Sequence, residues 1–278
     1  MKTALITGIS SGIGFHLSLQ LTREGWSVFG VVRNREKLDH SLAAIEAERP
    51  ERLHVITADI DRADELSAAL RDLPAPDVLI NNAGYGLYGP FEELSDEQLR
   101  AQFETNFFSP LRIIRHYLPA MRERQSGRIV NISSILGQMV IPTGSAYCSS
   151  KWALEAASEA MRYELAPFGI EVCLVEPGLI KTNFKENMKL NATLEAEHSP
   201  YRFLNRLIGR EIKQYGRFAT SPESAADSIV RLMRRRRLPA RYRVGADAAF
   251  YSALKSILPG SFLDVIQRSY TENLHSKD

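Results

Sequence analysis

The chain has 278 residues, of which 44% are hydrophobic and 24% charged, so it is long enough for a large buried core and has an ordinary globular composition. Its net charge of +2 gives no general argument for binding nucleic acid. Its two cysteines cannot form a disulfide framework, and no apolar run is long enough to span a membrane. We therefore expect a cytoplasmic protein and, because the six histidines show no paired spacing, no metal site.

Short apolar runs alternate with longer segments of helical period, which is typical of βαβ units and a parallel sheet. The predicted strands are Thr3–Thr7, Ser27–Val32, Leu53–Ala58, Asp77–Asn81, Arg128–Ile132, Glu171–Val175 and Arg241–Val244. The predicted helices lie near Ile13–Arg23, Glu36–Glu48, Ala63–Leu70, Asp96–Arg124 and Tyr147–Ala166. Right-handed crossovers then favour an α/β, Rossmann-type doubly wound sheet of about seven strands, in the order 3-2-1-4-5-6-7, with helices on both faces.

Two segments depart from this alternation. Residues 185–217 interrupt it and carry apolar side chains at helical spacing, whereas residues 247–275 look like two helices broken at Pro259-Gly260. Because no linker separates them from the rest, we predict a single domain over residues 1–278, with a substrate lid near 185–217 and a C-terminal helical cap near 247–275. The cap could cover the active site, join an interface or touch a membrane, and the sequence does not decide among these.

A glycine-rich segment follows the first predicted strand and begins the first predicted helix. Glycines at this place permit a tight turn and let backbone N–H groups approach a pyrophosphate at the positive end of the helix. The spacing is G-x-x-x-G-x-G, which on its own also suits a turn without a ligand. We expect this segment to bind a dinucleotide through Gly8, Ser10, Ser11, Gly12, Ile13 and Gly14.

The end of the second predicted strand bears on which nicotinamide cofactor binds. An acidic residue there binds the ribose 2′-hydroxyl of NAD, whereas a nearby arginine accommodates the 2′-phosphate of NADP. Here Val32 stands where the acid is expected, Arg33 follows, and Arg35 is a further cation nearby. The pattern favours NADP(H) over NAD(H), although Arg33 could simply begin a loop, and some sites accept both cofactors.

Tyr147 and Lys151 are four residues apart in Y-C-S-S-K, a spacing that puts both on one face of a helix. A free phenol has a pKa of roughly 10, too high for proton exchange at neutral pH. A nearby ammonium favours the phenolate and lowers that pKa. Alone, a tyrosine at a helix start is usually a packing residue, but with the glycine-rich turn this pair predicts a redox enzyme in which Tyr147 moves a proton.

Several short motifs in order resemble the short-chain dehydrogenase/reductase family over at least Lys2 to Thr182. They are T-G-I-S-S-G-I-G, A-D-I, N-N-A-G, the N of E-T-N-F-F, N-I-S-S, Y-C-S-S-K, and Pro177-Gly178 followed by Thr182. The resemblance implies that Asn106, Ser134, Tyr147 and Lys151 form a catalytic tetrad. It also implies that Asp59 and Ile60 flank the adenine, that Asn82 lies along the cofactor, that Thr182 binds the nicotinamide carboxamide, and that the protein is a homodimer or homotetramer.

The expected substrate is a lipophilic alcohol, aldehyde or ketone. The loops after N-N-A-G and after Ser134 are mostly apolar, and the predicted lid adds Met188, Leu190, Tyr201, Phe203, Leu204 and Leu207. These side chains could instead serve only to pack the lid onto the core. The long chain and its tail resemble the retinol- and hydroxysteroid-dehydrogenase-like branch of the family.

Two other classes of protein compete with this hypothesis. A cofactor-sensing binding protein on the same fold would be expected to lack the tyrosine or the lysine. A peripheral membrane or nucleic-acid binder could use the seven arginines of Arg231–Arg243, four of them consecutive from Arg234 to Arg237. Such a run is more often a solvated helix end, where cations suit the helix dipole.

Overall fold

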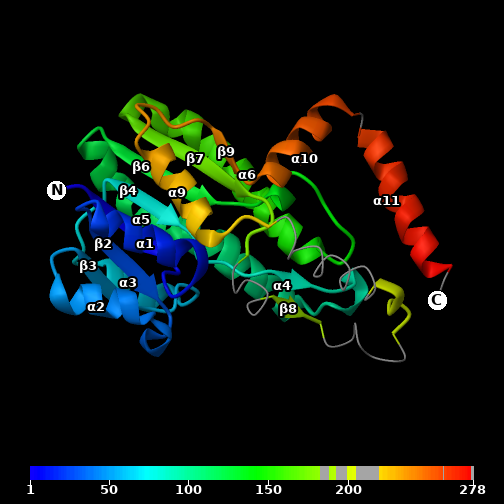
Figure 1. Ribbon diagram of the computed structural model, residues 1–278, viewed down its shortest axis with the longest axis horizontal. Helices are drawn as coiled ribbons and strands as arrows, with labels where there is room; N and C mark the ends of the chain where they lie inside the picture. Colours follow the sequence, from blue (N-terminus) through cyan, green and yellow to red (C-terminus); the bar gives the residue numbers. More distant parts are fainter. Residues whose placement is uncertain (182–187, 192–198, 205–218, 259, 277–278) are drawn as a thin grey trace.

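A seven-stranded parallel sheet forms the centre of the protein in this computed structural model, which describes residues 1–181, 188–191, 199–204, 219–258 and 260–276 (Figure 1). Its strands, in spatial order, are β3 (Leu53–Thr57), β2 (Ser27–Val32), β1 (Thr3–Thr7), β4 (Val78–Asn81), β6 (Gly127–Ile132), β7 (Ile170–Pro177) and β9 (Arg241–Val244). Leaving aside the short strands β5 (Leu87–Tyr88) and β8 (Lys189–Leu190), which pair separately, this is the predicted order, so the predicted fold class is confirmed.

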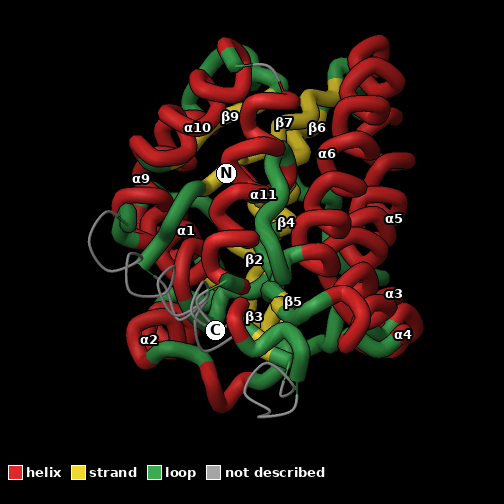
Figure 2. Tube along the Cα trace, turned by 90° about the vertical axis from the view of Figure 1, so that its right-hand side faces the viewer, coloured by secondary structure: helices red, strands yellow, loops and turns green. Residues whose placement is uncertain are grey.

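Helices cover both faces of the sheet, which explains why its strands are apolar without a polar alternation. On one face, α1 (Gly12–Arg23), α2 (His40–Glu48) and α9 (Pro222–Met233) pack against alternate strand residues such as Ala4 and Ile6. On the other face, α3 (Ala63–Leu70), α5 (Ser109–Glu123) and the end of α6 (Ser145–Leu165) pack against residues such as Leu5. Figure 2 shows the two groups of helices on opposite sides of the strands.

Two predicted helices are shorter or more broken than their hydrophobic period indicates. Asp39 caps α2 by accepting a hydrogen bond from the N–H of Ser41, so the helix begins there, after a separate 3-10 turn over Arg35–Lys37. The stretch predicted as one helix over Asp96–Arg124 is divided into α4 (Asp96–Phe103), a π-helical segment (Glu104–Phe108) and α5. A π-helical segment inside a helix is frequently found at a functional site.

The C-terminal part holds α10 (Ala246–Ile257) and α11 (Gly260–His275), two helices where the sequence predicts two. In Figures 1 and 2, α11 stands apart from the helical layers, in front of the carboxyl ends of the strands. The arginine run follows α9: Arg234 pairs with Glu24 at 2.5 Å, and Arg235 lies over the Tyr242 ring. None of the helices in the described part of the chain combines the length and the apolar character that a membrane-spanning segment needs.

Candidate active site

A cleft of about 1770 Å³ opens at the carboxyl ends of the central strands, the edge at which doubly wound sheets bind ligands. It takes in the turn after β1, the end of β2, and the segments after β4, β6 and β7. The predicted site residues that line it are Gly8, Ser10, Ser11, Gly12, Ile13, Arg33, Asp59, Ile60, Asn82, Ser134, Tyr147 and Lys151. Gly14 and Asn106 are buried behind its wall, and Thr182 lies outside the described residues.

The glycine-rich turn has the backbone that its sequence predicts. Gly8 and Gly12 adopt φ angles of +73° and +60°, in the region that favours glycine. A methyl group at Gly14 would lie 2.3 Å from the carbonyl oxygen of Gly8, so α1 can approach the turn only because this residue has no side chain. The N-terminus of α1 has neither a side-chain cap nor an acidic residue in its first turn, which fits a pyrophosphate there.

Asn82 fixes this turn to the end of β4. Its Nδ2 donates hydrogen bonds to the carbonyl oxygens of Thr7 at 2.9 Å and Gly8 at 3.1 Å. The hydroxyl of Thr7 in turn accepts the backbone N–H groups of Asn82 and Ala83 at 3.0 and 2.9 Å. Asn82 therefore shapes the cleft through the backbone of the glycine turn, in addition to lining it.

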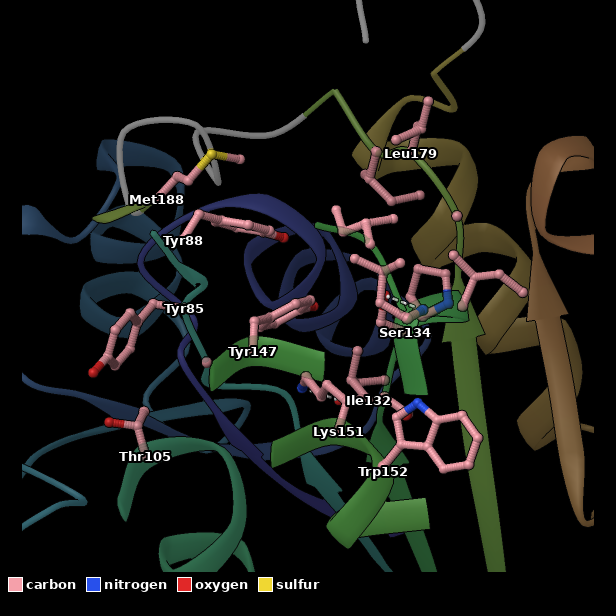
Figure 3. A pocket seen from close by; sticks show the side chains of 18 of the residues that line it. Tyr85, Tyr88, Thr105, Ile132, Ser134, Tyr147, Lys151, Trp152, Leu179 and Met188 are labelled. Atoms are coloured by element: carbon pink, nitrogen blue, oxygen red, sulfur yellow. Dashed lines mark hydrogen bonds between the residues drawn. The ribbon is translucent and has the colours of Figure 1, made fainter. Parts of the chain in front are cut away.

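Tyr147 and Lys151 lie on one face of α6, as their spacing predicts, with the Lys151 ammonium 5.9 Å from the centre of the Tyr147 ring (Figure 3). The Lys151 Nζ donates a hydrogen bond to the carbonyl oxygen of Ile132 at 2.8 Å. Burial lowers the pKa of Lys151 to about 8, and the carboxylate of Glu155 acts in the opposite direction. The amine is therefore poised to be a cation at neutral pH and to lose its proton at moderately alkaline pH.

Asn106 is held in the π-helical segment by three hydrogen bonds. Its Nδ2 donates to the carbonyl oxygen of Tyr85 and to the hydroxyl of Ser150, and its Oδ1 accepts the N–H of Tyr85. A methyl group at Gly84 would lie 3.0 Å from Asn106 Oδ1 and 3.7 Å from Lys151 Nζ, so the amide and the ammonium both lie beside this glycine. The sequence motif around Asn106 predicts this residue, whereas nothing in the sequence points to Ser150, whose contact depends on the packing of the helices.

Ser134 follows β6 and begins a 3-10 turn over Ile135–Gly137. Its Oγ accepts the N–H of Leu136 at 3.1 Å, which fixes the side chain at the cleft wall and leaves the hydroxyl proton to be donated elsewhere. The Tyr88 ring lies 5.7 Å from the Tyr147 ring, centre to centre. Figure 3 shows Ser134, Tyr147 and Lys151 together in the middle of the cleft, with Tyr88 above them.

The far end of the cleft, beyond β2 and β3, carries the predicted cation and a second one. Arg33, Asn34 and Lys37 line it together. Arg35 does not, because its guanidinium pairs with Glu46 and reaches the carbonyl oxygen of Val55. Lys37 was missed because it falls in a stretch predicted as helix, whereas the chain forms a short turn there that returns to the cleft.

The outer part of the cleft includes residues from both C-terminal helices, with apolar side chains beside polar ones such as Lys255, Asp264 and Glu272. Val140, Ile141, Trp152, Leu179, Leu254 and Ile266 are among its lining residues. Of the predicted lid residues, Met188 lines the cleft, Leu190 is exposed, Leu204 is buried, and Phe203 stacks edge-on against His275 of α11. Tyr201 bonds to Glu92 through its hydroxyl, and Leu207 lies outside the described residues.

A parallel doubly wound sheet with a glycine turn opening into a cleft at its carboxyl edge is the architecture of dinucleotide-binding enzymes. The sequence matches the family described as short chain dehydrogenase over residues 2–193. Retinol dehydrogenase 8 of Bos taurus is 33% identical, covering 95% of this chain and 88% of its own. A solved short-chain dehydrogenase from Streptomyces avermitilis is 34% identical with a TM-score of 0.80, covering 98% of this chain and 97% of its own.

A further solved structure, a short-chain dehydrogenase from Sphingobium yanoikuyae in complex with NADPH, is 25% identical with a TM-score of 0.73. It covers 92% of this chain and 93% of its own. The chain therefore belongs to the short-chain dehydrogenase/reductase family, as its motifs predict. It is an NAD(P)-dependent oxidoreductase that acts on alcohol or carbonyl groups.

Proposed function

We propose that this enzyme interconverts a lipophilic alcohol and its ketone or aldehyde with NADP(H), and that Tyr147 exchanges the proton. The observation that carries the proposal is that Tyr147, Lys151 and Ser134 share one cleft with the glycine turn and with Arg33. A cleft that joins a dinucleotide cradle to a proton donor beside a cation suits hydride transfer coupled to proton transfer. The competing hypothesis, a cofactor-sensing binding protein, gives no reason for both Tyr147 and Lys151 to lie in the cleft.

The cofactor would lie along the carboxyl edge of the sheet. The backbone of the glycine turn would hold its pyrophosphate, Asp59 and Ile60 its adenine, and Thr182 its carboxamide. Arg33 and Lys37 give this end of the cleft two cations for a 2′-phosphate, and Val32 stands where an NAD enzyme places an acid. The NADPH-bound relative from Sphingobium yanoikuyae also supports this preference.

When bound, the nicotinamide supplies or accepts the hydride, and the protein orients the substrate and moves the proton. In reduction, the hydroxyls of Ser134 and Tyr147 would both donate hydrogen bonds to the substrate oxygen, and Tyr147 would then release its proton to it. In oxidation, the Tyr147 phenolate would take the proton of the alcohol. Such acid–base assistance is worth roughly 10²–10⁴-fold in rate.

Lys151 would lower the pKa of the Tyr147 phenol, because a cation beside it favours the phenolate. It would also hold the nicotinamide ribose. Asn106 would help to keep a water molecule from which the proton is replaced through Lys151. The position of Asn106 and Lys151 beside Gly84 supports that role.

The lipophilic substrate is proposed from the outer cleft. Val140 and Trp152 are 60% and 44% exposed although both are apolar and line the cleft, which fits a surface that an apolar ligand covers. The similarity to retinol dehydrogenase 8 points in the same direction. We further propose one domain over residues 1–278, with residues near 185–217 as a substrate lid and residues near 247–275 as a cap that closes the outer cleft.

We also propose a homodimer or homotetramer formed through α6. Ala156 and Ala160 are exposed one turn apart on this helix, next to the 44% exposed Trp152 and the 67% exposed Tyr163. Aromatic side chains are enriched at protein interfaces, and the small alanine side chains between them leave room for a second helix. Sedimentation velocity at micromolar concentration should show an oligomer, and a monomer would refute this part of the proposal.

A substrate panel tests the proposed reaction. The rate of NADPH oxidation is measured with retinal, steroid ketones and long-chain ketones, and with small sugars of similar carbonyl reactivity. The whole series is then repeated with NADH. We expect kcat/KM to be at least about tenfold higher for the hydrophobic carbonyls and for NADPH, because each buried methylene and each phosphate contact contributes to binding. A preference for the sugars, or for NADH, would refute the corresponding half of the proposal.

A further inference from the structure

Two buried carboxylates lie behind the part of the cleft wall that carries Ser134, Tyr147 and Lys151. Glu155 is one helical turn after Lys151 on α6 and is 4% exposed. Glu176, near the end of β7, has no exposed surface. Buried carboxylates are costly to the fold unless they are paired, so their retention here calls for a physical reason.

Arg241 of β9 joins the two carboxylates. Its Nε lies 3.0 Å from Glu155 Oε2 and 3.2 Å from Glu176 Oε1, and its Nη2 lies 2.8 Å from Oε2 of the more exposed Glu159. Arg243 adds a longer contact of 3.6 Å to Glu176. The guanidinium of Arg241 thereby fixes the direction of the Glu155 side chain within the protein.

The same network is attached to the loop that carries Ser134. Glu176 Oε1 accepts a hydrogen bond from Gln138 Nε2 at 2.5 Å, and Gln138 ends the 3-10 turn that Ser134 begins. Ser133 and Glu155 meet beside Gly137, where a methyl group would lie 2.8 Å from Ser133 Oγ and 3.3 Å from Glu155 Oε1. Glu155 therefore lies beside the loop that carries Ser134, and its place on α6 is one turn after Lys151.

The charged groups around Glu155 come from four elements. They are Lys151 and Glu159 on α6, Glu176 on β7, Arg241 and Arg243 on β9, and Lys255 of α10, which bonds to the carbonyl oxygen of Gln138. Burial raises the pKa of Glu155, whereas Arg241 and Lys151 oppose that rise. Burial and the neighbouring Glu155 raise the pKa of Glu176 to about 6. Arg241 and Lys151 thus favour the ionised form of Glu155.

We propose that Glu155 is a positioning residue of the reaction: held by Arg241, its carboxylate keeps the buried ammonium of Lys151 protonated and thereby active towards Tyr147. Residues four apart on a helix are neighbours, and in a poorly solvated site a carboxylate stabilises an adjacent cation more than it does in water. The inference rests on the proposed function, since Lys151 acts through Tyr147. It adds that the charge of Lys151 at neutral pH depends on a group outside the cleft.

The test compares Glu155→Gln with Glu159→Gln. Both substitutions remove a carboxylate that contacts Arg241, but Glu159 has a 44% exposed side chain and lies two turns from Lys151. The first readout is the pH dependence of kcat for NADPH-dependent reduction of the best carbonyl. In Glu155→Gln we expect the alkaline limb to move to lower pH by about one unit. Glu159→Gln should keep the wild-type profile.

The second readout needs no turnover and separates this inference from the proposed function. The Lys151 Nζ is titrated by NMR in the cofactor-free enzyme labelled with ¹⁵N-lysine, and its signal is assigned with Lys151→Met. Its midpoint should fall by about one pH unit in Glu155→Gln and stay unchanged in Glu159→Gln. If wild type had no activity on any carbonyl, the proposed function would fail while this titration still tested the inference.

A third variant covers a failure of Glu155→Gln to fold. Glu155→Asp keeps the charge but withdraws it by one methylene, so the midpoint of Lys151 should fall in the same direction by a smaller amount. Equal midpoints in wild type and the folded Glu155 variants would overturn the inference. An equal shift in Glu159→Gln would also overturn it, because the effect would then belong to the charge around Arg241 in general.

Discussion

Lys151 is a residue whose surroundings set its chemistry more than its type does. An exposed lysine is a cation throughout the neutral range, whereas burial lowers the pKa of this one to about 8. Its partner Tyr147, four residues earlier, was predictable from spacing alone. The hydrogen bond of Lys151 to Ile132 was not, because it depends on how α6 packs against β6. The same spacing puts Glu155 one turn after Lys151, but the pairing of Glu155 with Arg241 depends on how α6 packs against β9.

Arg33 and Arg35 differ in a way that gives a matched pair of variants. Arg33 lines the cleft, while Arg35 is occupied by Glu46. If Arg33 binds the 2′-phosphate, Arg33→Ala should raise the KM for NADPH by roughly 10- to 100-fold, the usual loss for a charge-assisted hydrogen bond, and should hardly change the KM for NADH. Initial rates with both cofactors measure this. Arg35→Ala is the control, and an equal effect of the two substitutions would speak against the assignment.

The turn between β1 and α1 is an element that sequence and structure describe alike. Its glycine spacing predicted a tight turn, and in the structure Gly8 and Gly12 have positive φ angles and Gly14 lies close to Gly8. The hydrogen bonds between Asn82 and Thr7 that support this turn were not predictable. The two residues lie far apart in the sequence and meet only through the pairing of β1 with β4.

Gly14→Ala tests the close packing of this turn. The added methyl group would meet Gly8 O at 2.3 Å and Asn82 Nδ2 at 2.5 Å, and the backbone on both sides is fixed. We expect destabilisation of about 1–3 kcal/mol and a Tm lower by several degrees, together with weaker NADPH binding. Calorimetry and fluorescence titration measure these. Gly260→Ala, at the start of α11, is the control: a methyl group there meets no atom within 4 Å, so neither the Tm nor NADPH binding should fall.

The hydrophobic period predicted that a helix lies between Asp96 and Arg124, but not that this helix is interrupted. The stretch from Asp96 to Arg124 has a continuous period, yet a π-helical segment interrupts it at Asn106. That interruption coincides with the bonds of Asn106 to Tyr85 and Ser150, which are tertiary contacts. Similarly, the pairing of β5 with β8 joins two-residue strands, too short to leave a periodic signal.

At the scale of the whole molecule, the candidate catalytic and cofactor-binding residues lie together at one edge of the sheet. Alternating apolar runs and right-handed crossovers predicted a doubly wound sheet, and the observed strand order is that of the predicted Rossmann-type fold. The outer wall of the cleft was less predictable, since α11 reaches it from the end of the chain and is attached by contacts such as that of Gln267 with Val140. The inner cleft is thus formed by the segments that directly follow the central strands, whereas the outer cleft depends on contacts between segments far apart in sequence.

The proposed reaction and the proposed role of Glu155 both depend on Tyr147 as the proton donor. Tyr147→Phe removes one oxygen atom and keeps the ring that packs against Tyr88, so the fold and the cofactor site should persist. We predict that turnover of the best carbonyl falls by at least about 10²-fold while the Kd for NADPH stays within about twofold of wild type. Turnover in Tyr147→Phe close to that of wild type, with NADPH bound equally well, would contradict the role of Tyr147.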